Sequence, residues 1–157
     1  MKFRETLDVD VPAEFAFSEL SDHETIERLA MQRGVAIRRT DRLGKPGPGM
    51  AWIADWEWAG RKRRTNITLT RREPPKRLVI ETETAGVAGR LETEVVPMTA
   101  ESCRLIVESE VRAVTFGAKV VLQTIKLARG RIERAVGERI GQLSARLETR
   151  YAASKRA

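Results

Sequence analysis

The chain has 157 residues, of which 41% are apolar and 32% charged, and this balance predicts one folded domain over residues 1–157 rather than a disordered chain. The single cysteine, Cys103, excludes an intrachain disulfide, and no apolar run approaches the about 18 residues of a membrane span. The charged N-terminal residues do not resemble a signal peptide, so we expect a cytoplasmic protein.

The net charge of +7 is confined to the C-terminal quarter of the chain. Residues 1–116 contain 19 Lys and Arg and 19 Asp and Glu, whereas residues 117–157 contain ten and three. A basic segment of this kind can attract phosphates, anionic lipid or an acidic partner. It is also typical of a solvated helix face in a basic protein, so the charge pattern leaves both interpretations open.

The first forty residues predict a strand, two short helices and a second strand. Residues 2–11 alternate between apolar and polar side chains, which is the period of a half-buried strand. Pro12 suits a first helical turn, and the capping box Ser21-x-x-Glu24 predicts the start of a second helix that ends at Gly34. Residues 35–43 form the next strand candidate.

The middle of the chain alternates repeatedly, with turn-forming runs between the segments. Gly44-Lys45-Pro46-Gly47-Pro48-Gly49 excludes regular structure, Glu73-Pro74-Pro75 breaks a strand, and Gly86 to Gly89 predicts a hairpin. Pro97 to Ser102 is expected to be a connection. The predicted strands lie at 50–58, 61–72, 78–82, 91–95 and 103–111.

From Phe116 onward the period changes to that of an amphipathic helix. Because no proline interrupts this segment, we predict one long helix to the end of the chain. A sheet with one apolar face and an amphipathic helix can hide both surfaces only by packing together. The predicted class is therefore α+β: a curved antiparallel sheet, in the order β-α-α-β6-α, wrapped on the C-terminal helix.

Four features occur in order along the chain: Val9-Asp10-Val11-Pro12-Ala13-Glu14 with Phe17 and Leu20, Trp56-x-Trp58-x-Gly60, Glu73-Pro74-Pro75-Lys76-Arg77-Leu78, and the terminal helix. Together they resemble the SRPBCC or START-like (helix-grip) superfamily and its polyketide cyclase/dehydratase-like group. The resemblance implies a seven-stranded sheet that grips the last helix, with a cavity between them and two short helices closing one end. It also implies hydrophobic ligands such as lipids, sterols and polyketides, and in some members cyclisation or hydrolysis.

Alternation and helical spacing predict which apolar side chains line such a cavity. A filled core is the competing interpretation. Thr65, Thr82, Thr93, Ser109 and Gln123 or Thr124 are the polar groups expected among them. The predicted lining residues are Trp52, Trp56, Trp58, Ile67, Leu69, Ile80, Leu91, Val95, Leu105, Val107, Ile125, Ile132 and Val136.

Catalytic signals are weak in this sequence. His23, the single histidine, is expected at the surface or as a cap, and Asp55 and Glu57 are expected to point outward, away from the tryptophans. Cys103 is expected to be a buried small apolar residue. No set of residues predicts a metal site, a cofactor or a catalytic residue.

Three functions therefore remain open. The first is a carrier or sensor that binds a hydrophobic small molecule such as a lipid, quinone or polyketide. The second is a cyclase/dehydratase-like enzyme, and the third is an interaction protein whose basic surface meets an anionic membrane or an acidic partner. Arg61 to Arg64 alternate between the two sheet faces, so we do not expect nucleic-acid binding. Monomer and homodimer are both compatible with the sequence.

Overall fold

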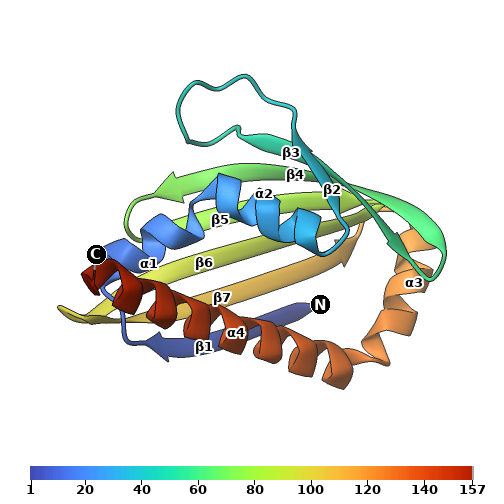
Figure 1. Ribbon diagram of the computed structural model, residues 1–157. Coiled ribbons are helices and arrows are strands. Elements are labelled where there is room, and N and C mark those ends of the chain that lie inside the picture. The colour runs from blue at the N-terminus through green and yellow to red at the C-terminus, as the bar shows by residue number, and fades with distance from the viewer. Residues whose placement is uncertain (157) are drawn as a thin grey trace.

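Seven antiparallel strands form one curved sheet in the computed structural model, which describes residues 1–156. The strand order is β1-β7-β6-β5-β4-β3-β2, which confirms the predicted α+β helix-grip class (Figure 1). Along the chain the elements are β1 (Lys2–Val9), α1 (Ala13–Leu20), α2 (His23–Gln32), β2 (Ala36–Arg39), β3 (Ala51–Trp58), β4 (Arg61–Glu73), β5 (Arg77–Thr84), β6 (Val87–Thr99), β7 (Ser102–Ala113), α3 (Phe116–Lys126) and α4 (Arg129–Arg156).

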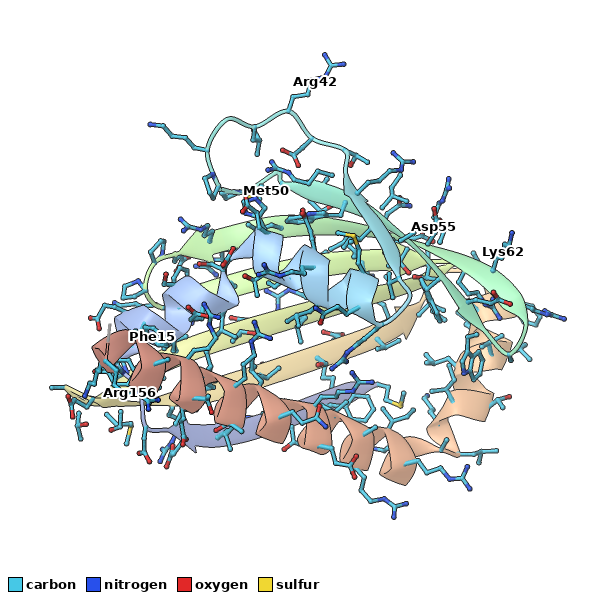
Figure 2. The ribbon with its side chains drawn as sticks, viewed as in Figure 1. Phe15, Arg42, Met50, Asp55, Lys62 and Arg156 are labelled. Carbon is cyan, nitrogen blue, oxygen red and sulfur yellow. The ribbon has the colours of Figure 1, made fainter. Side chains whose placement is uncertain are left out.

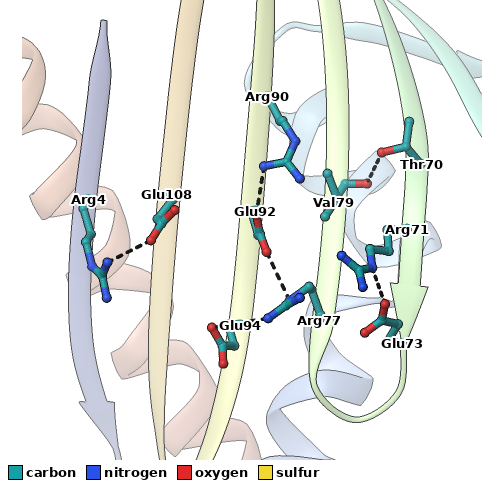
Figure 3. Close-up of polar contacts among 10 residues, drawn as sticks. All are labelled: Arg4, Thr70, Arg71, Glu73, Arg77, Val79, Arg90, Glu92, Glu94 and Glu108. Carbon is teal, nitrogen blue, oxygen red and sulfur yellow. Dashed lines mark hydrogen bonds and ion pairs between the residues drawn. The ribbon is translucent and has the colours of Figure 1, made fainter.

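The convex face of the sheet is charged, and its side chains pair across neighbouring strands (Figure 3). Arg4 on β1 lies 2.9 Å from Glu108 on β7, and Glu92 on β6 lies 3.1 Å from Arg77 on β5 and, within its own strand, 2.8 Å from Arg90. Such pairs are compatible with solvent on that side, so most of the buried apolar side chains lie on the concave face.

The helices cover different parts of the concave face (Figure 1). Helix α4 runs along β1, α2 lies near the β2 edge, and α1 closes the end where α4 finishes. The rings of Phe15 on α1 and Tyr151 on α4 are 5.0 Å apart, and Arg150 pairs with Glu19 beside them. These contacts join the two ends of the chain around the sheet.

Burial decreases along the strands from the α1 end towards α3. On the concave face of β6, Val95 is 2% exposed but Leu91 is 38% exposed. On β3, Trp52 is 9% exposed whereas Trp58 is 67% exposed. The core is therefore concentrated at the α1 end, and the concave face becomes more open towards the α3 end.

The predicted single C-terminal helix is wrong, because the segment forms two helices. The N–H groups of Leu127 and Ala128 donate to the carbonyls of Thr124 and Ile125, three residues back, which tightens the last turn of α3. Helix α3 packs on β7 and α4 packs on β1, so the chain has to change direction at this point. Sequence periodicity does not detect the change, because no proline marks it.

Several predicted boundaries also differ from the structure. The N-cap of α2 is Asp22, whose carboxylate accepts from Thr25 N and Thr25 Oγ1, and not Ser21. The hairpin turns at Ala85–Gly86, so Gly89 lies inside β6. Strand β6 also includes Pro97, which was expected in a connection, and β2 covers only Ala36–Arg39 of the predicted strand 35–43.

Candidate ligand-binding site

An apolar cavity of about 200 Å³ lies between α2 and the concave face of strands β2 to β5. The helix contributes Ile26 and Glu27 to its wall, and the sheet contributes Trp52, Ile67 and Leu69. This volume is below the roughly 300–1,000 Å³ of most ligand pockets. It suits a small apolar molecule or one end of a longer one.

Four of the thirteen residues predicted to line a cavity meet in this space. Trp52 comes from β3, Ile67 and Leu69 from β4, and Ile80 from β5. The register explains their meeting, because Trp52 pairs with Ile67 and Leu69 pairs with Ile80 across adjacent strands. Thr82, predicted as a polar group on the same face, also lines the cavity.

The other nine predicted residues lie outside this cavity. Val95 and Leu105 belong to the buried core, while Trp58 and Leu91 are exposed. None of the described residues of α4 (Arg129–Arg156) lines the cavity, so its roof is α2 rather than the C-terminal helix. The remaining half-buried residues are Trp56, Val107, Ile125, Ile132 and Val136.

Arg72 is a cavity residue that sequence alternation misses. A β-bulge between Leu69 and Arg71 shifts the phase of β4, so Arg72 pairs with the inward-facing Leu78, while Arg71 pairs with Val79 on the convex side. The guanidinium of Arg72 lies 5.6 Å from the centroid of the Phe17 ring. Its Nε is buried and has no hydrogen-bond partner among residues 1–156. A buried donor without a partner is costly, and a ligand oxygen would satisfy it.

Glu27 and His23 add two more polar groups to the cavity wall. Glu27 Oε1 accepts a 2.7 Å hydrogen bond from Trp52 Nε1, which fixes the indole ring against the helix. His23, for which the sequence predicts a surface or capping position, is the first residue of α2, directly after the N-cap Asp22, and it is half-buried and lines the cavity. The spacing of residues 23, 26 and 27 places them on the same helix face.

The loop before β3 contributes Pro46 and Met50 to another side of the cavity. Figure 2 shows Met50 at the end of this loop. Asp41 holds this loop: its carboxylate pairs with Arg39 and accepts from the N–H groups of Leu43 and Ala51. The hydrogen bond from Arg39 is the main reason that the pKa of Asp41 is far below its ordinary value.

Other polar groups predicted for the interior have different positions. Thr65 Oγ1 accepts a 2.9 Å hydrogen bond from Trp56 Nε1 and lies 2.7 Å from Thr84 Oγ1. The hydroxyl of Thr65 is therefore hydrogen-bonded to other protein side chains. Gln123 and Thr124 are exposed on α3. Cys103 is buried as predicted, and burial raises the pKa of its thiol.

Two larger surface hollows, of about 560 and 550 Å³, are lined mainly by charged side chains. One contains Lys62, Arg63 and Arg64 together with Asp55, and the other lies around Arg129 at the edge of β1. Among residues 1–156, no cluster of three potential metal ligands occurs and no helix is long and apolar enough to span a bilayer. An apolar ligand fits the apolar wall of the smaller cavity under α2 better than these two charged hollows.

Comparison with solved structures gives the same fold. The Zhui aromatase/cyclase from Streptomyces sp. R1128 superposes with a TM-score of 0.72 at 12% identity, covering 96% of this chain and 94% of that one. A START superfamily protein from Mycobacterium smegmatis gives 0.61 at 18% identity, with 97% of each chain covered. Norcoclaurine synthase from Thalictrum flavum gives 0.57 at 15% identity, covering 78% and 75%. At these identities the likeness shows the fold alone.

Sequence comparison identifies the family. No curated protein matches the chain. Residues 1–148, however, match the model of a family described as polyketide cyclase / dehydrase and lipid transport. This match confirms the resemblance seen in the sequence, and its description covers both ligand carriage and cyclase chemistry. The chain belongs to the polyketide cyclase / dehydrase and lipid transport family.

Proposed function

We propose that the protein binds and carries a hydrophobic small molecule of the lipid, quinone or polyketide type. The observation behind this proposal is the apolar cavity under α2, whose lining includes Arg72, a residue with a buried Nε that has no hydrogen-bond partner among residues 1–156. Apolar walls provide affinity for the hydrocarbon part of a ligand, and one polar group fixes its orientation. An oxygen of the ligand, most favourably a carboxylate, would accept from Arg72.

The cavity is small, but the neighbouring part of the concave face is open. Ile80 in the cavity wall pairs with Leu91 on β6, which is exposed on the same side of the sheet. A ligand longer than the cavity can place its polar end near Arg72 and its apolar remainder along Leu91. Lipids and polyketides, which the family's description names, are compatible with this arrangement.

The test measures binding of a fatty acid, the matching fatty alcohol and a quinone, by native mass spectrometry and by quenching of tryptophan fluorescence. Trp52 reports directly, because its ring forms part of the wall. We expect the acid to bind at least about tenfold more tightly than the alcohol, the effect of one hydrogen bond to a charged group. Arg72→Met should remove this preference.

Arg71→Met is the matched control, since Arg71 is the neighbouring residue on the convex face and pairs there with Glu73 (Figure 3). It should keep the preference for the acid. If no apolar ligand gives a bound mass or quenches fluorescence, the carrier proposal is wrong. If ligands bind but Arg72→Met retains the preference, the role of Arg72 is wrong while the carrier function stands.

A cyclase-like activity is a second candidate, and the position of His23 favours it. The imidazole lies in the cavity wall, where it can exchange protons with a bound carbonyl compound. Incubation with a poly-β-keto thioester should then give a ring-closed product, and His23→Ala should slow its formation. Equal rates for the wild-type and variant proteins would exclude this role of His23.

A further inference from the structure

One end of the molecule exposes several large apolar side chains. In the antiparallel meander, β3, β5 and β7 all finish at the same end of the sheet, and α3 begins there. Val114 N donates to Gly86 O at 2.7 Å, which ties the start of α3 to the β5–β6 hairpin. Arg129 donates to the carbonyl of Lys2 at 2.7 Å, which brings the start of α4 to the same end. We call residues 57–62 and 114–134 together the α3 pole.

The outer face of α3 is apolar. Phe116 is 83% exposed and Leu127, just after the helix, is 90% exposed. Residues 116, 120 and 127 project within about 40° of one another at 100° per residue, so Val120 shares their face. Ala118 and Leu122 on the opposite side are buried and hold the helix on β7. The packing of α3 on the sheet therefore does not use its exposed face.

Trp58 adds an exposed indole at the same pole, at the end of β3. Free exposure of these side chains is unfavourable by roughly 25 cal/mol per Å² of apolar surface. Exposed apolar clusters of this kind mark surfaces that meet another apolar phase or partner.

The charge of the α3 pole indicates what kind of partner this apolar surface meets. Its two segments contain seven Lys and Arg and two Glu, a net charge of +5, and α3 itself contains no acidic residue. Glu133, one of the two acids, is paired with Arg129 at 2.9 Å. Lys62 projects from the β3–β4 hairpin at the same end of the sheet as α3 (Figure 2). A second copy of the chain would bring equal positive charge against this surface.

We propose that the α3 pole docks on an anionic lipid bilayer. Phe116, Val120 and Leu127 enter the boundary between head groups and acyl chains, and Trp58 lies at the level of the head groups. The surrounding Lys and Arg side chains contact the lipid phosphates, each contributing about fivefold to binding near a charged surface. Docking requires no ligand in the cavity, so this proposal and the carrier proposal can fail separately.

The experiment is flotation of the full chain with vesicles of phosphatidylcholine alone or with 30% phosphatidylglycerol, at low and at high salt. We expect binding only to the anionic vesicles, and loss of that binding at high salt because the charges are screened. Lys119→Glu/Lys126→Glu should weaken binding by at least tenfold. Phe116→Ser/Leu127→Ser should weaken it to a similar extent without changing the circular dichroism spectrum.

The matched control is Lys45→Glu/Lys76→Glu, which changes the net charge equally but at exposed positions in the opposite loops. It should bind like the wild-type protein. A blue shift of tryptophan fluorescence on binding should disappear in Trp58→Phe.

Three results would overturn the proposal. These are no flotation with anionic vesicles at low salt, equal flotation with neutral vesicles, and an equal loss of binding in the Lys45/Lys76 variant. A concentration-dependent dimer that Phe116→Ser/Leu127→Ser abolishes would assign the surface to a second copy of the chain instead.

Discussion

Trp52 on β3 and Glu27 on α2 are joined by a 2.7 Å hydrogen bond from the indole Nε1 to the carboxylate. This bond crosses from the sheet to the helix at the wall of the apolar cavity, and both residues line that cavity. It therefore positions α2 as the roof and fixes one face of the indole towards the interior.

The Trp52–Glu27 bond should be measurable as a coupling between the two residues. In a double-mutant cycle of Trp52→Phe and Glu27→Ala, we expect a coupling free energy of about 1–2 kcal/mol, because the acceptor is charged and partly buried. Urea unfolding of the four proteins provides the values. A coupling near zero would mean that α2 is held in place by packing alone.

Leu147 should anchor α4 to the sheet. It is the fully buried side chain of that helix, and Leu147→Ala should lower the free energy of unfolding by about 2–5 kcal/mol. Leu127→Ala, a chemically identical change in the exposed connection to α3, should change it by less than about 0.5 kcal/mol. Similar losses in the two variants would contradict the packing described for α4.

Gly86 should tolerate alanine less well than Gly34 does. Both have φ near +80°, where an L-residue costs about 1–2 kcal/mol. A Cβ at Gly86 would lie 2.5 Å from Thr115 Oγ1, the acceptor that caps α3, whereas nothing lies within 4 Å at Gly34. Gly86→Ala should therefore destabilise the protein more than Gly34→Ala and increase hydrogen exchange in the first turn of α3. Equal losses and unchanged exchange would show that Thr115 moves aside freely.

Acid should weaken the protein partly through Asp41. Its pKa is lowered in the folded state, chiefly by the hydrogen bond from Arg39, so the folded protein binds fewer protons than the unfolded chain. The stabilisation is thus fully present above the unfolded pKa of about 3.9 and is lost as the pH falls towards the folded value. Asp41→Asn should be less stable than wild type at pH 7, and the difference should shrink below about pH 4.

Urea unfolding between pH 2.5 and 7 measures this difference. Asp10→Asn, at an exposed position outside the network around Asp41, serves as the control and should follow the wild-type pH dependence. A difference between Asp41→Asn and wild type that stays constant over this range would contradict the role of Asp41.

The sequence was sufficient to predict the sheet and the apolar face of most strands. Strand alternation identifies which side chains share a face, and the structure has Trp52, Ile67, Leu69 and Ile80, all assigned to one face, in the wall of the cavity under α2. It does not identify what covers that face. The exposure of Trp58 and Leu91 follows from the positions of the helices, which periodicity cannot provide.

Two local features escaped prediction for physical reasons. The bulge after Leu69 reverses the alternation of β4, so Arg72 and not Arg71 faces the cavity, and the sequence there contains no glycine to signal a bulge. The tight turn at Leu127 and Ala128 separates α3 from α4 although both residues favour helix. Tertiary packing on β7 and on β1 decides that break, not local propensity.

Because burial decreases along the strands, the two ends of the sheet contribute unequally to the free energy of folding. The tightly packed contacts around α1 and Leu147 provide most of the free energy that keeps the chain folded. Side chains at the opposite end contribute little to that free energy, so mutations can accumulate there while the fold persists. The cavity wall differs in this respect, because Met50, Trp52 and Leu69 belong to both the cavity and the buried core, so a change there alters folding and ligand contacts together.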